Sequence, residues 1–338
     1  MSSEYNDYSL AQLEVQTKAL SFLSAAATKS FASSTSTVVV AEYGCSTGGN
    51  SPASFNAILS AAKNCNVGDV TFIMNDRPTN DWNKVSTTIS PMNKYKFHLV
   101  PRSFLEVVTT PESIALGFSF VSVHWLSAVP PLNKAFHGME GTAEEKALYK
   151  TISKNDWANF LSARCSELKI GGRLVVTGDG ELPSGRYCLD ESGRAFFNSA
   201  LRVAARFQST TICDVIGHAF VAGYMPRSEA EVTEGLENEK VCGKLQLEQL
   251  SVEEIPCPYL RKYREDNDTE NFGRSVAMFW KVCEEAILSD ALSTAGFSEE
   301  KSNKFLAACW AEHEAYAAKN VDECHVGHIQ FFATFVRC

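Results

Sequence analysis

Apolar and polar residues follow two different periods along the first 180 positions. From residue 9 to residue 32 apolar side chains recur at helical spacing among alanine, glutamine, glutamate and lysine, which predicts an amphipathic helix. A β-branched run at 38–43 predicts a buried strand, and a glycine-rich turn and a helix over about 52–64 follow it. This part of the chain is therefore expected to fold as a helix followed by a strand–turn–helix unit.

Further apolar runs continue this alternation. Four more strands are expected, at 70–74, 95–100, 114–123 and 173–177. A long helix is expected over about 143–168, ended by the glycine pair Gly171 and Gly172. Strands that alternate with helices favour a parallel, doubly wound sheet, so the fold class is predicted to be α/β.

The second half of the chain has mostly helical periodicity. Two segments differ, because the alternation at 244–250 and the apolar run at 328–336 predict strands that return to the sheet. We therefore expect three parts: an N-terminal helical segment at 1–32, a sheet domain made of 33–180, 241–255 and 325–338, and a helical cap made of 181–240 and 256–324.

Composition narrows the range of partners. The 338 residues carry a net charge of −9 and no separate run of lysine or arginine, which disfavours nucleic acid and anionic membranes as partners. No secretory signal and no apolar run near the roughly 20 residues that span a bilayer is found. The 11 cysteines are odd in number, scattered and never arranged as CxxC, which is typical of reduced thiols in a cytoplasmic protein.

The turn after the first strand and the acid after the second predict a nucleotide-type site. The turn at 44–50 is rich in glycine, which lets the backbone approach a ligand closely. Asp76 could accept two hydrogen bonds from a ribose, and Glu42 is expected at the same edge of the sheet. The turn lacks G-x-G-x-x-G spacing, and Asp76 comes 32 residues after Gly44 rather than about 20, which argues against NAD. A second interpretation of Asp76 is a cap of the following helix.

Separated motifs resemble those of one family of methyltransferases. The most specific is N-D-R-P-x-N-D-W-N at residues 75–83; others lie at Tyr5 to Gln12, 44–50, Ser103-Phe104, 122–130, 171–175 and 220–231. Together they resemble the SABATH family, whose members methylate carboxylates such as salicylate, benzoate, jasmonate and indole-acetate, or xanthine ring nitrogens. Gly49 departs from the family pattern, which usually has proline there.

The resemblance implies a fold, a cofactor and a set of site residues. The fold would be a Rossmann-like class I methyltransferase sheet, mostly parallel with an antiparallel last strand, and a helical cap. The residues that would surround S-adenosylmethionine are Tyr5, Glu42, Gly44, Asn50, Asp76, Ser103, Phe104 and Ser122. Gln12 and Trp125 would donate hydrogen bonds to a substrate carboxylate. Family members are often dimers, so a homodimer is possible.

The chemistry of carboxyl methylation suits these residues. A carboxylate of pKa near 4 is ionised at neutral pH and is already a nucleophile, so no general base is needed. Neutral donors such as Gln12 and Trp125 orient the anion while leaving it reactive, because charge is neutralised in the transition state. Without the resemblance, Trp125 would be interpreted as a buried core aromatic and Gln12 as a surface residue of a helix.

Other candidate side chains are assigned more modest roles. His124 is expected to line the substrate pocket, because a single histidine is more often a hydrogen-bonding residue than a catalyst. Phe196, Phe197 and Phe220 could line an apolar acyl pocket or form part of the core. No metal is expected. Cys324, His325 and His328 lack a second ligand cluster. Some members of the family that the chain resembles place a divalent ion near an F-N segment, but here Phe220 is followed by Val221, which supplies no oxygen ligand.

The sequence therefore predicts an S-adenosylmethionine-dependent O-methyltransferase that forms the methyl ester of a small, largely apolar carboxylic acid. Three alternatives stay open: an N-methyltransferase of a purine-like heterocycle on the same fold, a catalytically silent cofactor-binding homologue, and a nicotinamide oxidoreductase. The intact motifs at Tyr5, Gln12, Asp76 and Trp125 argue against a silent homologue. The glycine spacing argues against the oxidoreductase.

Overall fold

A twisted mixed sheet forms the centre of the protein in the computed structural model, which describes residues 10–32, 36–218 and 220–338. In this part of the chain seven strands pair in the order β3-β2-β1-β4-β5-β7-β6. Their bounds are β1 Thr37–Tyr43, β2 Asp69–Asp76, β3 Lys96–Pro101, β4 Ile114–Ser119, β5 Leu168–Asp179, β6 Leu245–Ile255 and β7 His328–Arg337. The strands from β3 to β5 are parallel, whereas β7 is antiparallel to both β5 and β6, which confirms the predicted fold class.

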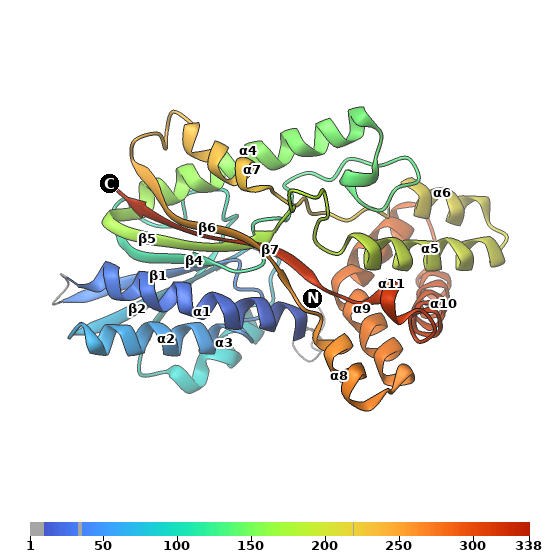
Figure 1. Cartoon of the computed structure of the whole chain (residues 1–338), viewed down its shortest axis with the longest axis horizontal. Helices are drawn as coiled ribbons and strands as arrows, with labels where there is room; N and C mark the ends of the chain where they lie inside the picture. Colours follow the sequence, from blue (N-terminus) through green and yellow to red (C-terminus); the bar gives the residue numbers. More distant parts are fainter. Residues whose placement is uncertain (1–9, 33–35, 219) are drawn as a thin grey trace.

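Helices cover both faces of the sheet (Figure 1). One face carries α1 and α2, and the other carries α4 and α7. The helices around the sheet are α1 Leu10–Phe31, α2 Ser51–Asn64, α3 Trp82–Ile89, α4 Ala143–Glu167 and α7 Glu229–Glu234. Aromatic residues fill the space beneath them, with Phe55 against Phe72 on one face and Trp157 stacked on Phe160 on the other.

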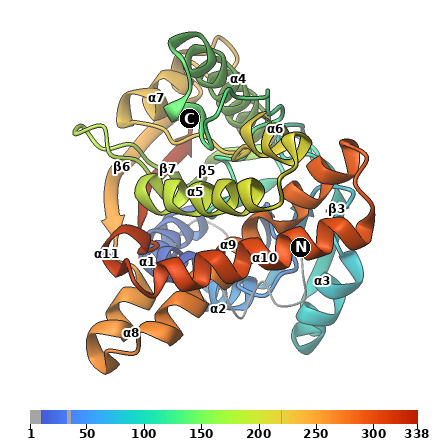
Figure 2. The same cartoon turned by 90° about the vertical axis from the view of Figure 1, so that its right-hand side faces the viewer.

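The remaining helices form a cap beside the carboxyl ends of the parallel strands (Figure 1). They are α5 Asp190–Arg206, α6 Thr210–His218, α8 Pro258–Asp266, α9 Thr269–Thr294, α10 Glu299–Ala317 and α11 Val321–Cys324. Figure 2 shows α5 and α10 lying across this end of the molecule. Phe196 lies between Trp280 and Trp310, with ring centroids 5.3 Å apart on each side and nearly parallel planes. This aromatic stack joins α5, α9 and α10 into one core.

Two boundaries differ from the expected ones for identifiable reasons. The strand expected at 173–177 begins at Leu168, directly after α4, and the glycine pair lies inside it at a register shift. Gly172 is required there because a Cβ would lie 2.8 Å from the carbonyl oxygen of Lys169. The strand expected to reach residue 123 ends at Ser119, since Val121 has a positive φ of 53° and turns the chain.

Segment 181–240, which the sequence assigned wholly to the helical cap, divides between the cap and the sheet domain. Within it, α7 packs against α4, and the Trp157 indole donates a hydrogen bond of 2.9 Å to the carbonyl oxygen of Val232. Val232 belongs to the apolar cluster of the sheet, not to that of the cap helices. No helix among the described residues combines the length and apolar character needed to cross a membrane.

All 11 cysteines lie in the described ranges, and all are free thiols.

Candidate cofactor and substrate site

The glycine-rich turn after β1 brings three of the predicted cofactor residues together. Gly44 has a φ of +82°, and a Cβ there would lie 2.4 Å from the Ser122 Oγ and 3.8 Å from the Phe104 ring. The Ser122 hydroxyl donates a hydrogen bond of 3.1 Å to the carbonyl oxygen of Gly44. Gly44, Phe104 and Ser122 therefore share one small region at the carboxyl end of the sheet, and only glycine fits at position 44.

Asp76 binds this turn instead of capping the next helix. Its Oδ2 accepts a hydrogen bond of 2.7 Å from the Ser46 amide, and its Oδ1 accepts one of 2.7 Å from the Arg77 amide. The cap of α3 is Asp81, whose side chain accepts from the Lys84 amide. The capping interpretation of Asp76 is therefore wrong. Burial raises the pKa of the Asp76 carboxyl above its usual value.

Glu42 lies in β1 beside Asp76 and has few partners. Burial, together with the negative charge of Asp76, raises the pKa of the Glu42 carboxyl to about 7. Its Oε2 is buried and accepts no hydrogen bond from the described residues. Two neighbouring carboxyl groups, one of them incompletely paired, suit a ligand that carries both positive charge and hydroxyl groups.

The remaining predicted cofactor residues flank the turn. Asn50 precedes α2, and its carbonyl oxygen accepts a hydrogen bond of 2.7 Å from the Gln16 side chain, which also donates to Ser54. The Ser103 Oγ accepts from the Leu105 amide. Tyr5 lies outside the described residues. Sequence reasoning missed Gln16, although it lies one helical turn after Gln12 on the same face of α1.

Trp125 lies in the loop after β4 and is 37% exposed. Its backbone pairs with that of Tyr224, and the two rings meet edge to face with centroids 5.6 Å apart. Its indole Nε1 donates no hydrogen bond to any residue that the structure describes. Trp125 is therefore not the buried core aromatic of the alternative interpretation, and its donor is available.

Gln12 is buried, although it lies on the N-terminal helix. It is 8% exposed, and its Nε2 lies 3.9 Å from the Cys283 Sγ on α9. Its Oε1 has no hydrogen-bond partner in the described part of the chain. The interpretation of Gln12 as a surface residue is therefore wrong, and α1 reaches the cap through this side chain.

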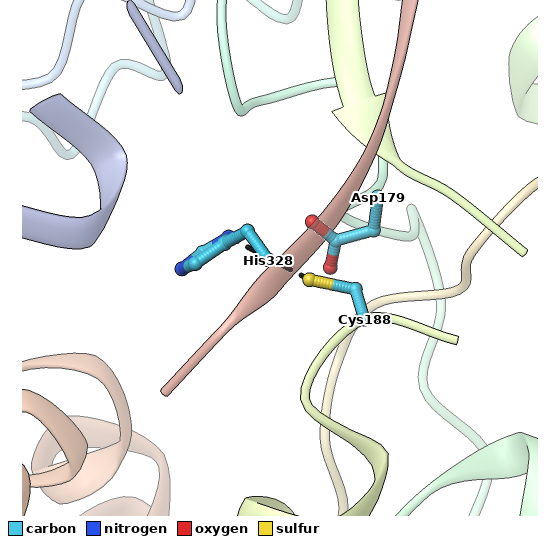
Figure 3. A group of neighbouring side chains, drawn as sticks. All are labelled: Asp179, Cys188 and His328. Carbon is cyan, nitrogen blue, oxygen red and sulfur yellow. Dashed lines mark hydrogen bonds between the residues drawn. The ribbon is translucent and has the colours of Figure 1, made fainter. Parts of the chain in front are cut away.

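A buried polar cluster lies next to His124, the residue before Trp125. Figure 3 shows the side chains of Asp179, Cys188 and His328 gathered around β7. One side-chain oxygen, sulfur or nitrogen atom of each lies within 4.8 Å of those of the other two. The Gln330 amide donates a hydrogen bond of 2.5 Å to Asp179, and the Cys188 Sγ lies 3.6 Å from the His328 Nδ1. From the sequence, His328 was considered together with Cys324 and His325. In the structure its side chain lies instead with Asp179 and Cys188. No sequence signal linked them, because they come from three segments.

The same cluster holds His124, the residue before Trp125. The His124 Nδ1 accepts a hydrogen bond of 3.2 Å from the Asp179 amide and lies 3.3 Å from the Asp179 carboxylate. Burial lowers the pKa of the His124 imidazole, so the ring is neutral at pH 7. The cluster therefore fixes the backbone that presents Trp125.

The three phenylalanines assigned to the acyl pocket lie in the cap. Phe196, Phe197 and Phe220 are all buried, and each lies within about 6 Å of the Phe136 ring. They belong to the apolar cluster that joins the cap helices. A direct role in binding substrate stays a prediction.

The comparisons with known proteins give a family. The family of SAM-dependent carboxyl methyltransferases matches residues 2–330. The chain belongs to this family. S-adenosylmethionine (SAM) is the cofactor of these carboxyl methyltransferases, as the sequence motifs predicted.

Relatives of this chain occur in fungi and plants. Methyltransferase LUC1 of Fusarium sp is 32% identical over 203 residues, which cover 54% of this chain and 51% of the relative. Farnesoic acid carboxyl-O-methyltransferase of Arabidopsis thaliana is 32% identical over 157 residues, which cover 42% of this chain and 45% of the relative. The alignments thus span about half the length of these curated relatives.

A solved structure shares the fold along nearly the whole chain. Loganic acid methyltransferase with SAH matches with a TM-score of 0.79 at 19% identity and covers 98% of this chain and 96% of that one. At this identity the match shows a common fold.

Proposed function

We propose that this chain is a SAM-dependent O-methyltransferase that forms the methyl ester of a small, largely apolar carboxylic acid. The observation that carries this proposal is the pair of uncharged donors, Gln12 and Trp125. Both lie at the carboxyl-end side of the sheet, and neither side-chain N–H has a good protein acceptor. Family membership supports the reaction class.

Each donor contacts one neighbouring side chain. The Gln12 side chain contacts Cys283 on α9, and the Trp125 ring packs on the Tyr224 ring. A carboxylate bound in this region could receive one hydrogen bond from each donor. No arginine or lysine is needed there, and a cation would stabilise the ground-state anion more than the transition state.

The cofactor would lie in the turn after β1. Gly44, Ser122 and Phe104 would allow its close approach, and Glu42 and Asp76 would bind its positively charged and hydroxyl groups. Asn50, Ser103 and Tyr5 are proposed to complete the contacts. SAM supplies an electrophilic methyl group on a sulfonium.

The chain's own part in the reaction is positional. Gln12 and Trp125 would orient the substrate carboxylate toward the methyl group, and the neighbouring apolar side chains would exclude water. SAM, when bound, would supply the methyl group and leave as S-adenosylhomocysteine, so no residue of this chain would need to take up a proton. His124 is neutral and held by Asp179, so it supports the Trp125 loop and takes no proton from the substrate.

A methyl-transfer screen tests this proposal. Radiolabelled SAM is incubated with aromatic, indolic and terpenoid acids, and with xanthine-type heterocycles as the competing class. We expect methyl esters with at least one acid, and a loss of turnover in Gln12→Ala and Trp125→Ala without loss of cofactor binding measured by calorimetry. Methylation of heterocycles alone would favour the N-methyltransferase, and cofactor binding without any product would favour a silent homologue.

A further inference from the structure

The backbone on both sides of Trp125 is tied to one neighbouring segment. Trp125 itself pairs with Tyr224 as an antiparallel bridge. The Leu126 amide donates a hydrogen bond of 2.9 Å to the carbonyl oxygen of Gly223. The carbonyl oxygen of His124 accepts one of 2.9 Å from the amide of the residue after Tyr224. Because the backbone is held before and after Trp125, the part of this residue that can change direction is its indole ring.

The indole rests against the residue of this segment that has no side chain. A Cβ on Gly223 would lie 3.5 Å from both the Cε3 and the Cζ3 of the Trp125 ring, and 3.3 Å from the Val129 Cγ2. Cε3 and Cζ3 lie on the edge of the indole opposite Nε1, so this contact leaves the N–H donor on the side of the ring away from Gly223. Gly223 does not have a positive φ, so space for the ring, and not backbone conformation, explains a glycine at this position.

The indole is held by protein on one side and is open on another. The Tyr224 ring meets it edge to face, with planes 80° apart. Trp125 is nevertheless 37% exposed, so the apolar core does not enclose its ring. A side chain at position 223 would therefore turn the indole toward open space, and the direction of Nε1 would change with it.

We propose that Gly223 is a positioning residue for methyl transfer: its lack of a side chain leaves the space in which the Trp125 indole rests, and this sets the direction of Nε1 toward the substrate carboxylate. This inference rests on the proposed function, in which Trp125 is one of the two donors. A misplacement of about 1 Å can cost about a hundredfold in rate. The volume of the side chain at position 223 should therefore control turnover without touching either ligand.

A volume series at position 223 tests this inference. In Gly223→Ala the new Cβ makes ordinary contact with the indole, and the exposed Val129 side chain can yield to it. In Gly223→Val two γ carbons fill two of the three directions from Cβ, so at least one must press on the indole or on Val129. We expect Gly223→Ala to keep most of the wild-type kcat/KM for the acid, and Gly223→Val to lose about tenfold or more. The affinity for S-adenosylhomocysteine, measured by calorimetry, should stay unchanged in both.

Fluorine NMR gives a readout of the ring that needs no substrate. The protein is labelled with 6-fluorotryptophan, which places the fluorine on Cη2 and leaves the two contact atoms of Trp125 unsubstituted. The chain has 5 tryptophans, and Trp125→Phe assigns the resonance of Trp125 by its disappearance. We expect Gly223→Val to shift this resonance and to leave those of the other tryptophans in place.

Gly217→Val is the matched control. Gly217 is a buried glycine of α6, and a Cβ there would lie 3.8 Å from the Lys134 Cγ, which is ordinary contact. The control should change neither the Trp125 resonance nor kcat/KM.

Three results would overturn the inference. The first is a Trp125 resonance that does not move in Gly223→Val, and the second is a wild-type kcat/KM in that variant. The third is a general disturbance, seen as movement of all the tryptophan resonances or as a loss of cofactor affinity, because position 223 would then serve the fold and not the placement of the ring. A wild type that binds SAM but esterifies no acid would refute the proposed function itself, whereas the fluorine spectra would still show whether Gly223 places the indole.

Discussion

Replacement of Gly44 by alanine should damage the cofactor turn in two separable ways. The residue has a φ of +82°, a conformation that costs an alanine roughly 1–2 kcal/mol. The new Cβ would also lie 2.4 Å from the Ser122 Oγ and 2.6 Å from the Ser122 Cβ. The hydroxyl could rotate away, but the Cβ belongs to a buried loop and cannot, so overpacking should add about 1–3 kcal/mol.

A double-mutant cycle separates the two effects. Gly44→Ala, Ser122→Gly and the double variant are compared by denaturant unfolding and by calorimetric titration with S-adenosylhomocysteine. We expect Gly44→Ala to lose about 2–5 kcal/mol of unfolding free energy. Adding Ser122→Gly should remove the clash with the new Cβ, so the double variant should recover the overpacking cost of about 1–3 kcal/mol and keep the backbone cost. Cofactor affinity should fall in Gly44→Ala and recover in part in the double variant.

Two results would contradict this reasoning. One is a Gly44→Ala protein within about 0.5 kcal/mol of the wild type, which is the range of an ordinary surface substitution. The other is strict additivity, because it would mean that Gly44 and Ser122 do not press on each other.

Three further predictions follow from individual side chains. Asp76→Asn should weaken cofactor binding, measured by calorimetry, by about tenfold or more. Asp81→Ala is the control: it should cost about 1 kcal/mol of unfolding free energy and leave cofactor binding unchanged, since Asp81 only caps α3. For Glu42 the ordinary pKa of 4.5 applies to the unfolded chain and about 7 to the folded one, so the folded state holds the extra proton between these values. The free energy of unfolding should therefore fall as the pH rises from 4.5 to 7, and Glu42→Gln should reduce that fall by about 3 kcal/mol in denaturant unfolding. A Glu42→Gln protein with the pH profile of the wild type would contradict the raised pKa of Glu42. Glu167→Ala should lose about 3–5 kcal/mol of unfolding free energy, because it leaves the fully buried Arg164 without its ion pair, and a loss below 1 kcal/mol would show that water reaches the guanidinium.

The positions of the strands followed from the sequence because each buried strand is a short run of β-branched or aromatic residues. The turn at Gly44 and the acid Asp76 could be placed together for the same reason, as they lie at the carboxyl ends of adjacent strands of the sheet. The capping alternative for Asp76 was resolved only by coordinates, since Asp81 is an equally good cap in sequence.

The substrate side was harder to predict because its residues come from distant segments. Gln12, Cys283, Trp125 and Tyr224 lie on four separate stretches of the chain, and no local pattern relates them. The polar cluster of Asp179, Cys188 and His328 was missed on the same grounds.

The first helix has a consequence for how the two ligands communicate. Gln16 anchors α1 to the start of α2, while Gln12, one turn earlier, touches α9 of the cap. Because the helix is anchored at the turn and touches the cap, a shift of the cap would be transmitted along α1 to the start of α2.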